Sequence, residues 1–74
     1  MNIGKRLYEL RTKKGYSMDK LALETMKVDK SGDFVKIQRQ TIDQYEKNIH
    51  SPNVAKLDVI CEALGVNLAT FFNI

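Results

Sequence analysis

A single cysteine, Cys61, in a chain of 74 residues is the feature that most constrains how this sequence folds. One thiol cannot form an internal disulfide, and it cannot supply a metal site built from cysteines. A chain of this length buries only roughly 60% of its unfolded surface, so its stability must come from packing alone. These conditions favour one compact all-helical domain over residues 1–74. On this length we expect neither a second, ligand-sensing domain nor the deep cleft of most small-molecule enzymes.

The charges are few in total but unevenly distributed along the chain. With 43% apolar residues, 28% charged residues and a net charge of +3, the composition is that of a globular protein. Residues 1–50 hold eleven Lys or Arg against seven Asp or Glu (+4), whereas residues 51–74 hold one against two (−1). A basic first half predicts a surface for an anionic partner. The surplus is densest at Lys5, Arg6, Arg11, Lys13 and Lys14.

The sequence shows no targeting or membrane segment. Residues 1–14 are charged from position five onward and lack the apolar run of a signal peptide. No stretch of the sequence approaches the roughly 20 apolar residues that a membrane span requires. We therefore expect a cytoplasmic protein.

Apolar residues recur at helical spacing in five segments, and capping residues separate these segments. Gly15 follows two lysines and ends the first segment, and Ser17 is a good N-cap for the second. Asn53 caps the fourth segment, Gly65 ends it, and Asn67 caps the last. The sequence thus predicts five helices around one core. Their expected apolar faces are Ile3, Leu7 and Leu10; Met18, Leu21, Ala22 and Met26; Ile42 and Tyr45; Val54, Leu57, Ile60, Cys61 and Leu64; and Leu68, Phe71 and Phe72.

Residues 27–36 (KVDKSGDFVK) interrupt this pattern. Ser31-Gly32-Asp33 is a turn signal with apolar residues on both sides, which fits either a loop or a small hairpin. The insert is either a plain surface extension, since lengthening a loop costs little entropy, or an added element that contacts DNA or a partner.

The helix expected over Gln38–Lys47 is unusually polar, with Ile42 and Tyr45 as its buried positions. Its polar positions 40, 43, 44 and 47 share one face at i, i+3, i+4, i+7 spacing. Gln makes bidentate contacts with adenine and Arg with guanine, and a helix fits the major groove of B-DNA. Two interpretations of this face stay open: an ordinary solvated surface, or a surface that reads DNA.

Short motifs follow one another along the chain: Gly4-Lys5-Arg6-Leu7, Leu10-Arg11, Lys14-Gly15-Tyr16-Ser17, Leu21-Ala22, Gln40-Thr41-Ile42-Asp43-Gln44-Tyr45-Glu46, Ser51-Pro52 and Ile60-Cys61-Glu62-Ala63-Leu64-Gly65-Val66. In this order and spacing they resemble the Cro/phage-repressor (XRE-type) helix-turn-helix family. The resemblance covers nearly the whole chain except residues 27–36. It implies an all-α, five-helix lambda-repressor-like domain with an extended loop or small hairpin between the second and third helices.

The resemblance also implies roles for individual residues. Arg11 and Glu46 match a pair expected to tie the first helix to the third by an ion pair, which is a structural role. The residues expected at base edges are Gln38, Arg39, Gln40, Asp43 and Gln44. The residues expected at the DNA backbone are Ser17, Lys20, Lys36, Thr41, Lys47, Asn48, His50 and Ser51.

The sequence departs from the family's pattern at four places. Met18 stands where the family often has a Gln that grips the DNA backbone, and Gln38 stands where Ser or Thr usually caps the third helix. Asn48 stands where Gly is common, which is tolerable because Asn can adopt the left-handed conformation. The largest departure is the distance of fifteen residues from Ala22 to Ile37.

We therefore expect a sequence-specific DNA-binding transcriptional regulator of bacterial or phage type, most simply a repressor, that places residues 38–47 in the major groove. Its expected partner is double-stranded DNA, which would associate it with the nucleoid, and no enzymatic activity, cofactor, metal or membrane is expected. The apolar C-terminus around Phe72 and Ile74 favours a homodimer. The alternative is a protein-interaction module, such as an antitoxin or a partner-dependent regulator, acting through residues 27–36 and the apolar C-terminus.

Overall fold

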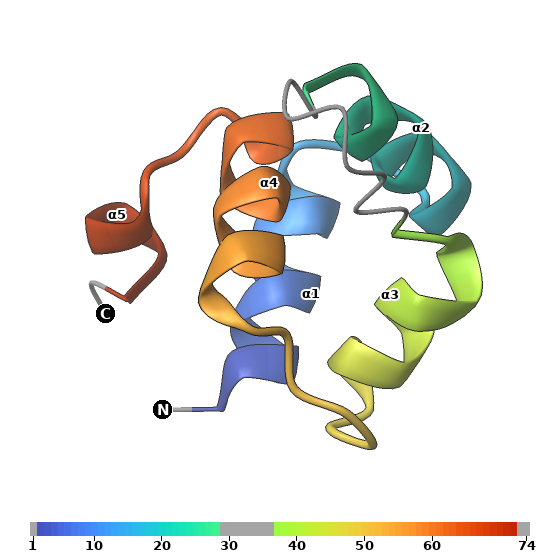
Figure 1. Cartoon of the computed structure of the whole chain (residues 1–74), viewed down its shortest axis with the longest axis vertical. Coiled ribbons are helices and arrows are strands. Elements are labelled where there is room, and N and C mark those ends of the chain that lie inside the picture. Colours follow the sequence, from blue (N-terminus) through green and yellow to red (C-terminus); the bar gives the residue numbers. More distant parts are fainter. Residues whose placement is uncertain (1, 29–36, 73–74) are drawn as a thin grey trace.

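The described part of the chain forms five helices in the predicted order. The computed structural model describes residues 2–28 and 37–72. The helices are α1 (Ile3–Lys13), α2 (Met18–Val28), α3 (Arg39–Glu46), α4 (Val54–Leu64) and α5 (Leu68–Phe72) (Figure 1). These residues contain no strand, and the all-helical fold class is confirmed. The choice between loop and hairpin lies outside the described residues, but Lys27 and Val28 belong to α2 and not to the insert.

The helix boundaries follow from local side-chain chemistry. Ser17, Asn53 and Asn67 each accept a hydrogen bond from the backbone N–H three residues later, at 2.7–3.0 Å, as N-caps do. Gly65 ends α4 with a φ of 74°, a left-handed conformation that glycine adopts without a Cβ penalty. Asn2 is an N-cap that was not predicted: its side chain accepts a hydrogen bond from the backbone N–H of Lys5 at 2.9 Å. Local sequence therefore sets where each helix begins or ends.

One core joins all five helices. α3 packs against α1 and α2, α2 also packs against α4, and α5 packs against α4 (Figure 1). Cys61 is buried in this core and behaves as a small apolar side chain, as expected. The buried apolar residues are Leu7, Leu21, Ile37, Ile42, Tyr45, Leu57, Ile60, Cys61, Ala63, Leu64 and Phe71.

Two expected core residues, Met26 and Val54, are exposed, and these predictions were wrong. The side chain of Met26 is 55% exposed, and Thr25 beside it is fully buried. The Thr25 hydroxyl donates a hydrogen bond to the carbonyl oxygen of Ala22 at 2.6 Å, which satisfies its polar group inside the core. Val54, at 73% exposure, is the first residue of α4, and the buried residues of this helix begin at Leu57. Hydrophobic spacing alone did not reveal that the buried stripe of α2 runs through Leu21 and a threonine.

Gly4 permits the close approach of α1 and α3. A Cβ at this position would lie 2.5 Å from the carbonyl oxygens of both Tyr45 and Glu46. Contacts that short are not tolerated, so only glycine allows the first turn of α1 to meet the end of α3. None of the helices in the described ranges is long and apolar enough to cross a bilayer.

Candidate nucleic-acid interface

α3 presents one polar face to solvent. Ile42 and Tyr45 are buried and anchor the helix, and the helix itself runs from Arg39 to Glu46. The predicted bounds, Gln38 and Lys47, are its caps, and the Gln38 side chain makes no capping hydrogen bond. On the side away from the core, Arg39, Gln40 and Lys47 are exposed, and Asp43 and Gln44 are half-buried. Sequence spacing and observed burial agree that Ile42 and Tyr45 form the buried side of this helix.

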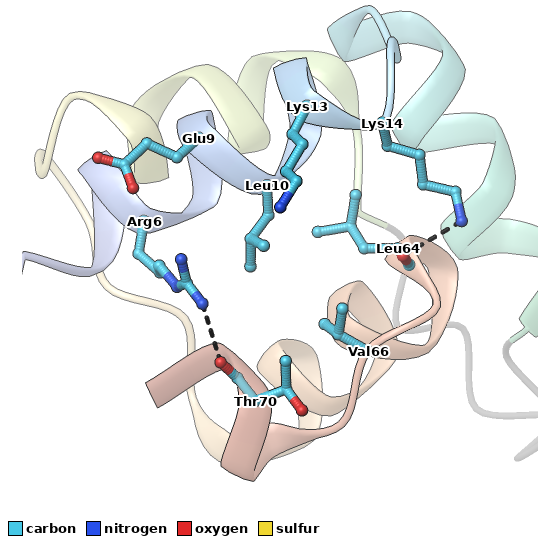
Figure 2. A pocket seen from close by; sticks show the side chains of 8 residues that line it. All are labelled: Arg6, Glu9, Leu10, Lys13, Lys14, Leu64, Val66 and Thr70. Atoms are coloured by element: carbon cyan, nitrogen blue, oxygen red, sulfur yellow. Dashed lines mark hydrogen bonds between the residues drawn. The ribbon is translucent and has the colours of Figure 1, made fainter. Parts of the chain in front are cut away.

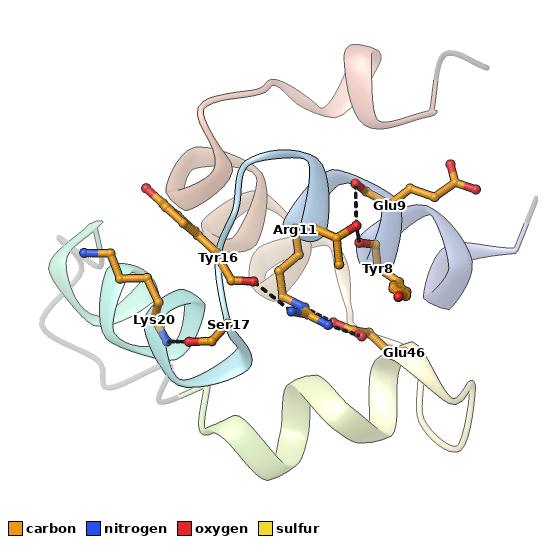
Figure 3. Close-up of polar contacts among 8 residues, drawn as sticks. Tyr8, Glu9, Arg11, Tyr16, Ser17, Lys20 and Glu46 are labelled. Atoms are coloured by element: carbon orange, nitrogen blue, oxygen red, sulfur yellow. Dashed lines mark hydrogen bonds and ion pairs between the residues drawn. The ribbon is translucent and has the colours of Figure 1, made fainter.

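Arg11 and Glu46 tie α3 to α1 through a bidentate ion pair (Figure 3). Arg11 Nε lies 2.6 Å from Glu46 Oε2, and Nη2 lies 3.0 Å from Oε1. Arg11 Nη1 also donates to the carbonyl oxygen of Tyr16 at 2.8 Å. The two side chains are only 11% and 8% exposed, and the hydrogen bond from Glu46 raises the pKa of Arg11. This pair fixes α3 relative to α1 and to the turn that precedes α2.

The exposed side chain of Asn48 links the turn after α3 to the start of α1. Its φ of 58° is left-handed, which is the conformation that the sequence predicted Asn would tolerate here. Its Oδ1 accepts a hydrogen bond from the backbone N–H of Gly4 at 3.2 Å, and its Nδ2 donates to Asn2 Oδ1 at 2.9 Å. The structure therefore gives the Asn48 side chain internal partners, whereas the sequence placed it at the DNA backbone.

Each cation on the exposed face of α3 has a carboxylate nearby. Arg39 Nε lies 3.5 Å from Oδ1 of Asp19, in the first turn of α2. Lys47 Nζ lies 3.1 Å from Asp43 Oδ2, one turn earlier on α3. Asp19 was not predicted to lie at this face, because it is on α2, on the other side of the insert from Arg39 in the sequence. No local signal in the sequence reveals such a pairing.

The start of α2 supplies a second polar edge. The Ser17 hydroxyl accepts the backbone N–H of Lys20 at 3.0 Å (Figure 3). Glu24 bridges Lys20 and Lys27 at 3.0 and 3.1 Å, and hydrogen bonds from these lysines lower the pKa of its carboxyl group. Lys20 nevertheless stays 47% exposed, so its ammonium group can reach an external anion.

Comparison with known proteins identifies the architecture to which this surface belongs. A family model described as Helix-turn-helix matches residues 7–71. The chain belongs to the helix-turn-helix family. The resemblance to the Cro/phage-repressor type is confirmed by this match, and the expectation that the domain is not an enzyme agrees with it.

Two similar proteins come from Rickettsia. An uncharacterized HTH-type transcriptional regulator of Rickettsia conorii is 36% identical over 70 residues, which cover 95% of this chain and 48% of that protein. One of Rickettsia prowazekii, with the same description, is 34% identical over 70 residues, covering 95% of this chain and 46% of that protein. The chain spans about half the length of these curated relatives. No solved structure shows a significant match.

Several basic residues of this helix-turn-helix domain lie away from α3. Arg6 Nε and Nη2 donate to the carbonyl oxygens of Phe71 and Thr70 at 2.8 and 2.9 Å, and Lys14 Nζ donates to that of Leu64 at 3.2 Å. These cations stabilise the C-terminal ends of α5 and α4. Arg6 and Lys14 line a groove of about 450 Å³ between α1 and the end of the fold formed by α4 and α5 (Figure 2). The groove is lined by Arg6, Glu9, Leu10, Lys13, Lys14, Leu64, Val66 and Thr70, with no residue of α3.

The basic residues near the N-terminus therefore do not share one surface. Arg6 and Lys14 face the α4–α5 end, and Arg11 is neutralised by Glu46. The cations of α1 point to different sides because different elements pack around this helix, and the expected surface for an anionic partner stays a prediction.

The remaining predicted DNA-contacting residues of the helix-turn-helix domain fall in three places. Thr41 lies half-buried in α3, and His50 and Ser51 are exposed in the turn that follows it. Lys36 lies outside the described residues. Within residues 2–28 and 37–72, no three His, Cys, Asp or Glu side chains gather as metal ligands would.

Proposed function

We propose that this chain is a sequence-specific DNA-binding transcriptional regulator that represses by occupying its operator, with α3 in the major groove. Membership of the helix-turn-helix family supports DNA binding, and the Rickettsia relatives carry the description of transcriptional regulators. The observation that carries the proposal is the exposed polar face of α3 on a helix held firmly by its other side. A rigidly mounted helix is what base readout requires, because bidentate contacts tolerate little displacement.

Base readout in this proposal falls to the N-terminal half and outer face of α3. Gln40 and Gln44 are one helical turn apart and offer the paired donor and acceptor that match adenine N6 and N7. Arg39, at the first helical position, has a guanidinium group whose paired N–H donors match guanine O6 and N7. Gln38 and Asp43 border these three residues.

Phosphate contacts in this proposal come from both flanks of α3. Lys20 and the Ser17 hydroxyl approach one strand from α2, and Lys47, His50 and Ser51 approach the other from the turn after α3. Thr41, half-buried, adds a hydroxyl close to the helix axis. Such contacts fix register and orientation without reading sequence.

We further propose that two copies bind together through α5. Phe72 is 46% exposed, and its ring meets the buried ring of Phe71 edge to face at 5.3 Å. A second copy covering Phe72 would remove this apolar surface from water. Two such domains would read half-sites about 34 Å apart, or a multiple of that distance, in a palindromic operator.

Selection of bound sequences from a random duplex pool tests the proposal. We expect enriched sites with two-fold symmetry and a steep loss of affinity as salt rises, because neutralised phosphates release counterions. Gln40→Ala and Gln44→Ala should each relax preference at separate base positions and leave thermal stability unchanged. Asp58→Ala, an exposed carboxylate on α4, is the matched control and should leave the preference intact. Absence of DNA binding even at low salt contradicts the proposal.

The regulatory direction needs a separate measurement. With a selected site placed across a promoter, expression of the chain should lower reporter output, whereas an activator would raise it. A chain that alters the reporter only together with another protein, and binds no duplex alone, would instead fit the partner-dependent alternative.

A further inference from the structure

We propose that Asp19 is a positioning residue that makes Arg39 prefer base edges over phosphates. This inference rests on the proposed function, since it assigns a source of specificity within the same DNA-reading face. The two residues lie on α2 and α3, with Asp19 Oδ1 3.5 Å from Arg39 Nε. Their side chains are 78% and 63% exposed, so the pair lies at the surface that DNA would approach and contributes little to stability.

Asp19 lies beside the guanidinium group of Arg39. The closest approach of Asp19 to the guanidinium is at Nε, at 3.5 Å, and the terminal nitrogens can form the bidentate pair with guanine O6 and N7. At this distance the carboxylate offsets part of the positive charge that Arg39 presents at the first turn of α3. Arg39 is also the first residue of α3, the end of a recognition helix that reaches furthest into the groove.

The negative charge of Asp19 affects which DNA groups the guanidinium of Arg39 favours. A phosphate near Arg39 is attracted by the guanidinium and repelled by the Asp19 carboxylate, so the two effects largely cancel. A guanine edge is neutral and gains the two hydrogen bonds without comparable repulsion. The pair of Asp43 and Lys47, at 3.1 Å, reduces the phosphate attraction of the same face in the same way. The face therefore binds arbitrary DNA weakly and depends on the correct bases.

Asp19→Asn tests this directly, because it removes the charge and keeps the shape. Two duplexes of equal length serve as probes: the site selected by the wild-type chain, and a random sequence. We expect affinity for the random duplex to rise about three- to tenfold at low salt, with a smaller rise for the selected site. The salt slope on random DNA should steepen by about one phosphate equivalent, or 0.9. Asp19→Glu, which restores the carboxylate, should keep the wild-type ratio of the two affinities.

Two further variants separate positioning from net charge. Glu9→Gln makes the same charge change in the groove between α1 and α5, away from α3, and should leave the ratio unchanged. In an Arg39→Gln background, Asp19→Asn should alter the ratio much less, because the guanidinium whose phosphate attraction Asp19 offsets is then absent. If Asp19→Asn and Glu9→Gln change the ratio of the two affinities equally, or if Asp19→Asn leaves that ratio unchanged, the inference is wrong. In that case the wild-type chain still binds DNA, and the proposed function stands. A wild-type chain that binds neither duplex overturns the proposed function and this inference together.

Discussion

Arg11 and Glu46 form a bidentate ion pair, at 2.6 and 3.0 Å, between the last turns of α1 and α3. Both side chains are nearly buried, and Arg11 has a further acceptor in the carbonyl oxygen of Tyr16. The guanidinium therefore connects three segments of the chain: α1, α3 and the turn before α2. Because α3 carries the face that we propose reads DNA, the pair links stability to the proposed function.

Glu46→Ala should destabilise the domain by about 3 kcal/mol, because it leaves the Arg11 charge buried without its partner. Urea unfolding followed by circular dichroism measures the loss. Replacing both residues, as in Arg11→Met with Glu46→Leu, should recover much of it, since no unpaired charge remains. The exposed carboxylate of Asp58 is the control, and Asp58→Ala should change stability by less than about 0.5 kcal/mol. A Glu46→Ala variant as stable as wild type would show that the pair is not needed.

Gly4→Ala should destabilise the domain by about 2 kcal/mol through overpacking. Its new methyl group would lie 2.5 Å from two backbone carbonyl oxygens at the end of α3, so α1 and α3 must separate. Lys5→Ala, at the exposed neighbouring position, should be nearly neutral. Thermal unfolding of both variants provides the comparison, and equal midpoints would contradict the close approach.

Asn48→Ala should cost about 2 kcal/mol, since it removes hydrogen bonds to Gly4 and Asn2 and leaves an alanine in a left-handed conformation. Asn48→Gly, which relieves the backbone strain, should recover part of this stability. If the side chain instead bound a DNA phosphate, Asn48→Ala would make DNA affinity depend less steeply on salt and would leave the unfolding midpoint unchanged. Unfolding and salt titration on the same samples separate the two roles.

Burial raises the pKa of the Cys61 thiol from 9.0 to about 11, with a smaller effect from the Asp58 charge. The folded state thus holds the proton more tightly than the unfolded state, so this contribution to stability is complete below pH 9 and is lost as the pH rises toward 11. The contribution is at most about 3 kcal/mol. Comparing the pH dependence of unfolding in wild type and Cys61→Ala isolates it. At pH 8 a thiol reagent should label Cys61 only in urea, and rapid labelling of the native protein would refute the burial.

Arg6 and Lys47 should respond differently to loss of charge. Arg6→Gln should lower stability by about 1 kcal/mol, because it weakens the hydrogen bonds to the end of α5, and should leave the DNA salt slope unchanged. Lys47→Gln should reduce that slope by about 0.9 with little effect on stability. Lys13→Gln, in the groove with Arg6, should not affect the slope. A reduced slope in Arg6→Gln would place α1 at the DNA after all.

Much of the fold could be predicted because its signals are local. Ser17, Asn53 and Asn67 are caps recognisable from a few neighbouring residues, and Gly65 marks the end of α4. The outer face of α3 was also predictable, because Ile42 and Tyr45 define the buried side of a regular helix. The exposure of Met26 and the burial of Thr25 were not, because which side of α2 is covered depends on helices from elsewhere in the chain.

The number, order and approximate ends of the helices and the polar face of α3 can be predicted from the amino-acid sequence, since they follow from spacing and capping within about one or two turns. The partners of the charged residues depend instead on how the helices pack, and they are known from the folded structure alone. It assigned Arg6 and Lys14 to carbonyl oxygens at the α4–α5 end, Asn48 to the start of α1, and Asp19 to Arg39. These contacts join residues far apart in sequence, and a side chain's hydrogen-bonding capacity does not indicate which distant group the packed helices bring within reach.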